Sequence, residues 1–240
     1  LITLLQPREY DEPDDAERVH EKAVDALANL ASEPAARDEI VSAGGITNLV
    51  SLLETEGSKC KTFAATALAR LSKDHEVTQK AIAHAGAIAS LVALLDGKEG
   101  LEAQEAAAGA ILALAEHKAN RQSITDADGI GYLVMLLGSS NPLAREHAEG
   151  ALVRLSIENA NRVSIIKKLV DMLQDPGAGG EEQAAAALAN LARESEDNRQ
   201  SIVDADGIKP LIELLETASS KAKENAVSAI KELCRNSKNN

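Results

Sequence analysis

Five residues, Asp-Ala-Asp-Gly-Ile, occur twice in the chain, at 126–130 and at 204–208. Two aspartates two positions apart and followed by glycine are typical of a calcium-binding EF-hand loop, in which carboxylates hold the ion around a sharp glycine turn. The rest of that loop does not match, because its first ligand position is isoleucine in both copies. The closing bidentate glutamate is Met135 in the first copy, and only Glu213 in the second copy fits. The sequence therefore argues against calcium binding.

Other residue types that could carry chemistry are dispersed. The glycine-rich stretch at 176–180 lacks the Lys-Ser/Thr pair of a phosphate loop, and no nucleophile lies beside a base. Cys60 and Cys234 match no metal or redox spacing, which favours buried, reduced thiols. The five histidines are not at metal-ligand spacing: His20, His75, His84, His117 and His147. We expect no cofactor, no metal and no catalytic activity in this chain.

The composition favours packed helices. The 240 residues are 45% hydrophobic but only 1% aromatic, and a core of Ala, Leu, Ile and Val suits helices better than sheets. The net charge of −13 argues against nucleic acid or an anionic membrane as a main partner. No stretch has the length of a transmembrane helix or the pattern of a signal peptide, so we expect a cytoplasmic protein, with the nucleus as a second location. The first residue is not Met, so we expect a fragment of a longer protein.

An internal repeat organises the chain. The hexapeptide ALANLA stands at 26–31 and at 187–192, with four related hexapeptides between and after them. The fourth positions of these hexapeptides, or the third position in the copy at 111–116 once the leucines are aligned, are called ladder positions below and are 41, 43, 41, 36 and 42 residues apart. Such a period is typical of helical repeats. The ladder positions are Asn29, Arg70, Ala113, Arg154, Asn190 and Glu232.

The Asp-Ala-Asp-Gly-Ile pentapeptide belongs to this repeat. It aligns with SAGGI at 42–46 and HAGAI at 84–88, always just before a leucine-rich segment such as LVSLLE. The aligned pentapeptides share a small residue, a glycine able to adopt positive φ and an isoleucine. This pattern indicates that one helix ends here and the chain turns into the next helix. A short first helix is expected before each turn, with Asn120 and Asn198 as N-caps in two repeats. A longer third helix follows the leucine-rich second helix.

Three helices, this turn and the period together resemble the armadillo repeat. The resemblance covers the whole chain, and the EHAEGALVRLS and EEQAAAALANLA stretches look like the arrays of plant-type U-box ubiquitin ligases and vacuolar armadillo scaffolds. It implies an all-α, right-handed superhelical solenoid of three-helix units in a single domain, 1–240. Repeat 157–192 lacks the five residues TDADG, so we expect its first helix to be truncated or fused to the second, with a local change in curvature. The predicted boundaries are a partial repeat at 1–32, repeats at 33–72, 73–116, 117–156, 157–192 and 193–236, and a tail at 237–240.

The resemblance also implies where a partner binds. In armadillo importins and catenins the third helices line the concave side, and ladder asparagines bind the backbone of an extended peptide beside a tryptophan four residues earlier. This chain has no tryptophan, and only Asn29 and Asn190 remain of the ladder asparagines, four repeats apart. Binding of a basic nuclear-import signal in the importin manner is therefore not expected.

Charged residues suggest another groove chemistry. Arg70 and Arg154 occupy ladder positions, and arginine forks suit carboxylates or phosphates, although each arginine could instead pair with a groove glutamate inside the array. Glutamates stand eight residues before five ladder positions, where they could serve a partner or only the helix dipole. The candidate partner-binding set in the concave groove is Asn29, Thr66, Arg70, Glu105, Gly109, Glu146, His147, Arg154, Gln183 and Asn190.

The sequence thus predicts a protein-interaction scaffold or adaptor that binds a protein or an extended peptide, acidic or phosphorylated, in its concave groove. Nucleic acid and direct membrane insertion are not expected. The alternative is a substrate-recruiting or regulatory array of a larger enzyme, such as a U-box-type ubiquitin ligase, with a catalytic domain outside this fragment. A third prediction is end-to-end self-association through uncapped termini.

Overall fold

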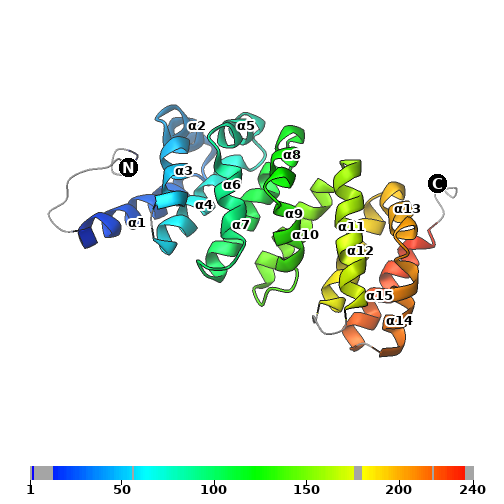
Figure 1. Cartoon of the computed structure of the whole chain (residues 1–240). Helices are drawn as coiled ribbons and strands as arrows, with labels where there is room; N and C mark the ends of the chain where they lie inside the picture. Colours follow the sequence, from blue (N-terminus) through cyan, green and yellow to red (C-terminus); the bar gives the residue numbers. More distant parts are fainter. Residues whose placement is uncertain (1, 3–12, 56, 176–179, 218, 236–240) are drawn as a thin grey trace. The chain divides into compact units, whose positions relative to one another are not determined.

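The structure is a computed structural model that describes residues 2, 13–55, 57–175, 180–217 and 219–235 (Figure 1). Over these residues the chain is all α-helical, as predicted, with no strand. It divides into two compact bodies, Leu1–Tyr132 and Leu133–Asn240. No described helix is by itself long and apolar enough to cross a membrane. Only the pair Glu76–His84 and Ala87–Leu94, bent by 86°, has that length and composition when taken together.

In the N-terminal body the helices follow the predicted order of first, second and third. The third helices α1, α4 and α7 pack side by side in chain order, and the second helices α3 and α6 also pack on each other. The helices are α1 (Pro13–Leu30), α2 (Pro34–Ser42), α3 (Gly45–Thr55), α4 (Ser58–Ser72), α5 (Glu76–His84), α6 (Ala87–Leu94), α7 (Leu101–Leu114), α8 (Lys118–Asp126) and the start of α9 (Gly129–Leu136).

In the C-terminal body the third helices are α10, α12 and α15, and α12 packs against both of the others. The helix α11 replaces the separate first and second helices of its repeat and packs against α13 and α14. Of the two alternatives predicted for the repeat without TDADG, fusion is therefore the one that occurs. The helices are α10 (Pro142–Leu155), α11 (Asn159–Gln174), α12 (Glu181–Glu194), α13 (Glu196–Asp204), α14 (Ile208–Thr217) and α15 (Ser220–Leu233).

The core consists of alanine from the third helices and leucine, isoleucine and valine from all helices. On α4, Ala64, Ala65 and Ala67 are fully buried, together with Leu68 and Leu71. Small alanine side chains let the third helices of successive repeats approach closely, while leucines fill the space beneath them. The near-absence of aromatic side chains follows from this close packing.

The turn between first and second helices differs in one respect from the prediction. The residue with positive φ is the third of each pentapeptide, and it is glycine in two repeats (Gly44, φ 78°; Gly86, φ 86°). In the other two repeats it is aspartate (Asp128, φ 58°; Asp206, φ 57°) and not the glycine that follows. Aspartate tolerates the left-handed region better than most residues do, because its short polar side chain bonds locally.

The glycine after this aspartate is required by close packing instead. A Cβ atom on Gly129 would lie 2.6 Å from Ile124 Cγ2 and 2.7 Å from the Ile124 carbonyl oxygen, and Gly207 is nearly as crowded by Ile202. The first aspartate of each copy accepts a bond from a glutamine one helical turn earlier, as Gln122 Nε2 does to Asp126 Oδ1 at 2.7 Å. The pentapeptide is therefore explained as a helix junction. Within the described ranges, no three His, Cys, Asp or Glu side chains are arranged to hold a metal ion.

The prediction that Asn120 and Asn198 are N-caps is wrong. The N-caps are His117 and Ser195, and both asparagines are buried in the first turn of their helices. Their amides reach back to the preceding third helix, where Asn120 Nδ2 donates to the Leu114 carbonyl at 3.1 Å. The carbonyls at a helix C-terminus have no partner within the helix, so donors from the next repeat satisfy them.

The residue after each of these asparagines is arginine, and Arg37 takes the same position in its repeat, where Ala36 replaces the asparagine. Arginines at this repeat position donate to the same helix ends. Arg37 Nε donates to the Ala31 carbonyl at 2.9 Å, and Arg121 Nη1 donates to the Ala115 carbonyl at 3.1 Å. A cation near a helix C-terminus is also favoured by the helix dipole. Each first helix in these repeats is thereby fixed to the third helix before it.

The two cysteines differ in burial. Cys60 is buried in α4, as predicted, whereas Cys234 is exposed, contrary to the prediction. Cys234 is the C-cap residue of α15, beyond the last residue of the helix. Cys60 and Cys234 are not joined by a disulfide.

Candidate functional site

The predicted site residues lie on third helices. Asn29, Arg70 and Ala113 belong to α1, α4 and α7 of the N-terminal body. In the C-terminal body, the ladder positions Arg154, Asn190 and Glu232 belong to α10, α12 and α15. We call the surface formed by these helices the third-helix face of each body.

In the N-terminal body, the ladder side chains of neighbouring repeats bond to one another. Arg70 Nη1 donates to the Ala28 carbonyl at 2.5 Å and to Asn29 Oδ1 at 3.1 Å. Asn29 Nδ2 in turn donates to Asp25 Oδ1 at 3.3 Å. Arg70 thus has partners inside the array, but they are neutral oxygens. No carboxylate among the described residues forms an ion pair with its guanidinium, so its charge is not neutralised there.

In the C-terminal body, Arg154 differs from Asn190. Arg154 is exposed, and its side chain forms no hydrogen bond or ion pair with any residue that the structure describes. Asn190 is half-buried and occupied, because its amide donates to Glu149 Oε1 and its carbonyl oxygen accepts from Arg193 Nη1 at 2.8 Å. Both remaining ladder asparagines therefore hold neighbouring side chains, while Arg154 presents its charge to solvent.

The other predicted residues are divided between internal and exposed positions. Thr66 donates its hydroxyl to the Thr62 carbonyl of its own helix at 2.8 Å. Glu146 on α10 is exposed. Thr66 is half-buried, and so are Glu105, Gly109, His147 and Gln183.

Two of the glutamates eight residues before the ladder pair with lysines. Glu21 Oε2 lies 3.5 Å from Lys59 Nζ, which joins α1 to α4, and Glu224 Oε2 lies 3.4 Å from Lys221 Nζ on its own helix. Both lysine side chains are well exposed, so each pair contributes little to stability. For these two glutamates, the interpretation as array-internal charges fits the geometry.

A cleft of about 360 Å³ opens on the third-helix face of the C-terminal body. Side chains from three successive third helices line it. Two of these side chains are basic and two are acidic. Of the predicted set, only Gln183 lies here, and its Oε1 is buried with no hydrogen-bond partner among the described residues. The polar lining side chains are Arg145 and Glu149 of α10, Glu182 and Gln183 of α12, and Lys221 and Asn225 of α15.

Sequence reasoning missed most of this lining. Asn225 stands seven residues before Glu232, the same offset that places Gln183 relative to Asn190, so helical spacing would have found it. Its Nδ2 donates to the Glu182 carbonyl at 3.0 Å, which joins α15 to α12 across the cleft floor. Arg145 stands nine residues before Arg154, whereas the predicted groove residues stand four, seven or eight residues before their ladder positions, so its place in the cleft does not follow from the repeat spacing.

The ladder carboxylate Glu232 is held by two arginines. Arg235 Nη1 lies 2.9 Å from Glu232 Oε2, and Arg193 Nε lies 4.0 Å from Glu232 Oε1. The hydrogen bond from Arg235, aided by the charges of both arginines, lowers the pKa of Glu232 below its ordinary value. Glu232 therefore remains ionised at neutral pH.

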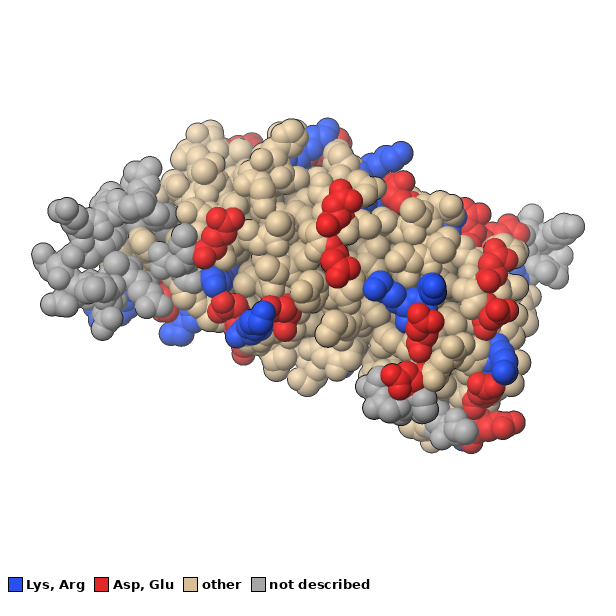
Figure 2. Space-filling view, in the orientation of Figure 1, with Lys and Arg blue, Asp and Glu red and all other residues tan. Residues whose placement is uncertain are grey.

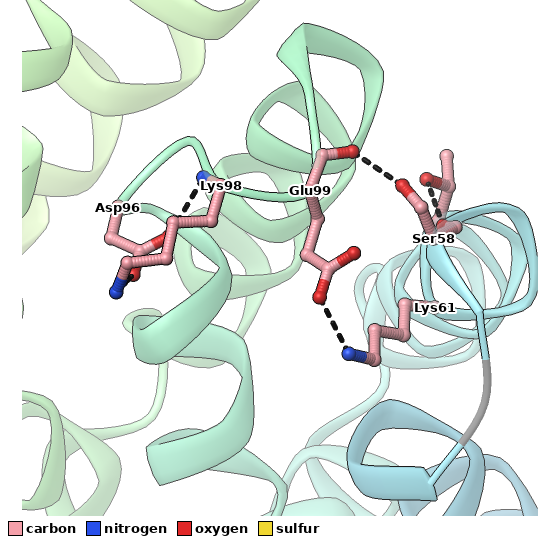
Figure 3. Close-up of polar contacts among 6 residues, drawn as sticks. Ser58, Lys61, Asp96, Lys98 and Glu99 are labelled. Carbon is pink, nitrogen blue, oxygen red and sulfur yellow. Dashed lines mark hydrogen bonds and ion pairs between the residues drawn. The ribbon is translucent and has the colours of Figure 1, made fainter.

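A polar cluster fixes the start of α7 against α4 in the N-terminal body (Figure 3). Lys61 Nζ lies 2.6 Å from Glu99 Oε1, and Ser58 donates its hydroxyl to the Glu99 carbonyl. In the same loop, Lys98 donates to Asp96 through its ammonium at 2.6 Å and its backbone N–H at 2.9 Å, which lowers the pKa of Asp96. These contacts set the positions of two third helices relative to each other.

The chain is similar to several known proteins. The model of the Armadillo/beta-catenin-like repeat matches residues 195–235. No curated protein matches the sequence. The crystal structure of one engineered protein is 30% identical, covers 97% of this chain and 94% of its own, and has a TM-score of 0.70. A second engineered protein is 26% identical, with 97% and 98% coverage and a TM-score of 0.70.

A designed armadillo repeat protein, solved in complex with the peptide (KR)4, shares the fold at 23% identity, with 97% coverage of both chains and a TM-score of 0.69. Three observations lead to the same family: the three-helix repeats, the stacked third helices within each body, and these similarities. This chain belongs to the armadillo-repeat family.

Proposed function

We propose that this chain is a protein-interaction scaffold that binds an extended segment of a partner across the third-helix face of its C-terminal body. The observation that carries the proposal is the cleft lined by α10, α12 and α15. Its volume of about 360 Å³ falls within the range of about 300–1,000 Å³ that is usual for ligand clefts. The similar designed armadillo repeat protein was solved with a bound peptide, which supports this class of ligand.

The lining suits a polypeptide backbone. An extended segment carries N–H and C=O groups that must find partners when they lose water. Gln183 Oε1, which has no partner among the described residues, can accept from a backbone N–H. Arg145 and Lys221 can donate to carbonyl oxygens, and Glu149 supplies a further acceptor.

Arg154 favours an acidic or phosphorylated residue in the partner. It is exposed and unpaired within the described chain, and a guanidinium forms bidentate bonds with carboxylate or phosphate. Arg70 keeps its charge while bonding to neutral oxygens, so it is a second, separate anchor in the N-terminal body. The role that follows is that of an adaptor.

The test is a selection of 12-residue peptides from a display library on the purified protein, followed by fluorescence anisotropy of the enriched sequences. Ala186→Arg fills the cleft and should weaken binding by about tenfold or more, since it displaces contacts across the cleft. The control, Met135→Arg, changes a 74% exposed residue on α9 and should leave affinity within about twofold. Equal effects of the two variants, or no enriched peptide, would refute the proposal.

Charge preference is tested separately. Arg154→Glu should reduce affinity for acidic or phosphorylated peptides, and increasing salt should weaken their binding to the wild type. If the enriched peptides are basic, or if Arg154→Glu has no effect, the anionic preference is wrong while the cleft remains. Self-association and cytoplasmic localisation stay predictions, the first of which is checked by size-exclusion mass at two concentrations.

A further inference from the structure

A second cleft lies in the C-terminal body away from the third helices. It has a volume of about 430 Å³ and lies between α11 and α13. It forms beside the fused helix of the repeat that lacks TDADG. Arg162 of α11 fixes the two helices together, with Nη1 3.6 Å from Asp197 Oδ2 and Nε 3.3 Å from the Ser201 hydroxyl.

The apolar part of this cleft includes a residue peculiar to the fused repeat. In the NR-x-SI segments of the first helices, the middle residue is glutamine at 122 and 200, and both glutamines bond to an aspartate one turn later. The fused repeat has no such aspartate, and the residue is Val163, which is 52% exposed at the cleft. Val170 and Ala205 continue the apolar surface.

Carboxylates border the same cleft. Asp171, Asp204 and Asp206 line it with one cation, Lys167, and none of the three forms an ion pair with any described residue. Asp204 ends α13, and within the described ranges its side chain accepts only the neutral amide of Gln200, at 2.8 Å. This arrangement differs from the remainder of α13, where Asp197 is paired with an arginine.

Helix ends add to the negative potential. The C-terminus of a helix carries a partial negative charge, so carboxylates there are unfavourable unless a cation is near. Asp204 and Asp206 stand at the C-terminus of α13, and Gln174 and Asp171 lie in the last turn of α11. Figure 2 shows carboxylates gathered over α13 and α14 on the visible face. A cation in the cleft would relieve this repulsion.

We propose that the cleft between α11 and α13 binds a lysine- or arginine-bearing segment of a partner protein. The aliphatic part of such a side chain would cover Val163, Val170 and Ala205, while its charged end would meet Asp171 and Asp206. Long basic side chains combine these two requirements, because their methylene stems bury against apolar surface and their heads stay among polar groups. This surface is distinct from the cleft between third helices, and a partner could occupy both.

The test uses tetralysine blocked at both ends as the probe and tetraglutamate as the opposite-charge probe, with NMR of the isotope-labelled full chain. Tetralysine should shift the methyl signals of Val163, Val170 and Ala205, and tetraglutamate should not. Added salt should weaken the effect of tetralysine, because charge attraction supplies much of the affinity.

Variants identify the surface. Asp171→Asn with Asp206→Asn should weaken tetralysine binding by about tenfold, since both carboxylates are lost. Asparagine tolerates the left-handed φ of residue 206, and Asp128→Asn is a matched control at the same conformation in the N-terminal body, expected to change affinity by less than about twofold. A second variant, Val163→Gln, restores the residue of the other repeats and should weaken binding while leaving the charges intact.

The outcomes separate this proposal from the proposed function. Ala186→Arg should leave the tetralysine shifts at Val163 unchanged, whatever it does to peptides in the third-helix cleft. The proposal is overturned if the shifts map to Glu149 and Glu182 instead, if Asp128→Asn weakens binding as much as the double variant, or if no shift occurs.

Discussion

Replacement of Asn120 by alanine should destabilise the N-terminal body more than the loss of a polar side chain usually does. The side chain is 3% exposed, and its amide donates to the Leu114 carbonyl at 3.1 Å and to the Gln79 carbonyl at 3.3 Å. Each such bond contributes about 1 kcal/mol net, and its removal leaves buried acceptors beside a small cavity. We therefore expect a loss of about 2–3 kcal/mol in the free energy of unfolding.

The measurement is urea unfolding followed by circular dichroism at 222 nm, with amide hydrogen exchange of α8 to localise the change. Asn198→Ala is the matched comparison, because that side chain donates one bond within the described residues, to the Leu191 carbonyl at 2.8 Å, and should cost about 1–1.5 kcal/mol. Ser123→Ala changes an exposed residue of α8 and should cost less than about 0.5 kcal/mol. If Asn120→Ala costs no more than Ser123→Ala, the reasoning about repeat-to-repeat bonding is wrong.

An isosteric variant separates hydrogen bonding from packing. Asn120→Asp keeps the shape but, when ionised, places a carboxylate against two carbonyl oxygens in a buried site. Burial and these acceptors should raise the folded-state pKa of the new carboxyl above its unfolded value. The folded state then holds the proton more tightly, so the variant should lose stability relative to wild type as pH rises through that range. A constant stability difference across pH would show that packing alone matters.

Three further predictions concern the turns and a surface pair. Gly129→Ala should cost about 1–3 kcal/mol in urea unfolding, because its Cβ would lie 2.6 Å from Ile124 Cγ2, and more than Gly207→Ala, where the same contact is 2.9 Å. A smaller cost at 129 than at 207 would contradict the steric explanation. Asp128→Gly should raise the melting temperature modestly, since it removes the strain of an L-residue at φ 58° and matches the glycines of two other repeats. A lower melting temperature would mean that the carboxylate itself stabilises the turn. Lys80→Met should raise the pKa of Glu76, which the hydrogen bond and charge of Lys80 now lower, as NMR titration of the carboxyl carbon will show. Because the pKa of Glu76 is lower in the folded state than in the unfolded state, the pair stabilises the fold slightly above the unfolded-state pKa, and this contribution should vanish as the pH falls. An unchanged pKa of Glu76 in Lys80→Met would exclude the pairing.

The repeat was predictable because the spacing of its apolar and turn residues is visible in the sequence. Hydrophobic periodicity and turn residues specify helices locally, and the same local pattern recurs about every 42 residues in all but the fused repeat. The fusion of first and second helices in α11 was also foreseeable, since the five residues that form the turn elsewhere are absent.

The candidate site was less predictable, because its bonds join residues about 40 positions apart. Arg70 was correctly placed on a third helix, but its bonds to Ala28 and Asn29 depend on the separation and tilt of α1 and α4. The same holds for Asn120, whose residue type suits an N-cap equally well. Sequence spacing tells which face of a helix a residue occupies, and not which neighbour its side chain reaches.

The two pentapeptides show how a ligand-like motif can arise from packing. The first aspartate accepts from a glutamine of its own helix, the second adopts positive φ, and the glycine avoids a clash with isoleucine. Each residue type has a separate structural cause. In the fused repeat the aspartates are absent, and the glutamine position holds Val163. The fused repeat thus lacks both the aspartate that accepts this hydrogen bond and the glutamine that donates it. This is expected if the glutamine serves only to hold the turn between the first and second helices. The same two changes expose the apolar side chain of Val163 in the cleft that Asp204 and Asp206 also line. A basic segment would meet there both an apolar surface for its methylene groups and carboxylates for its charge.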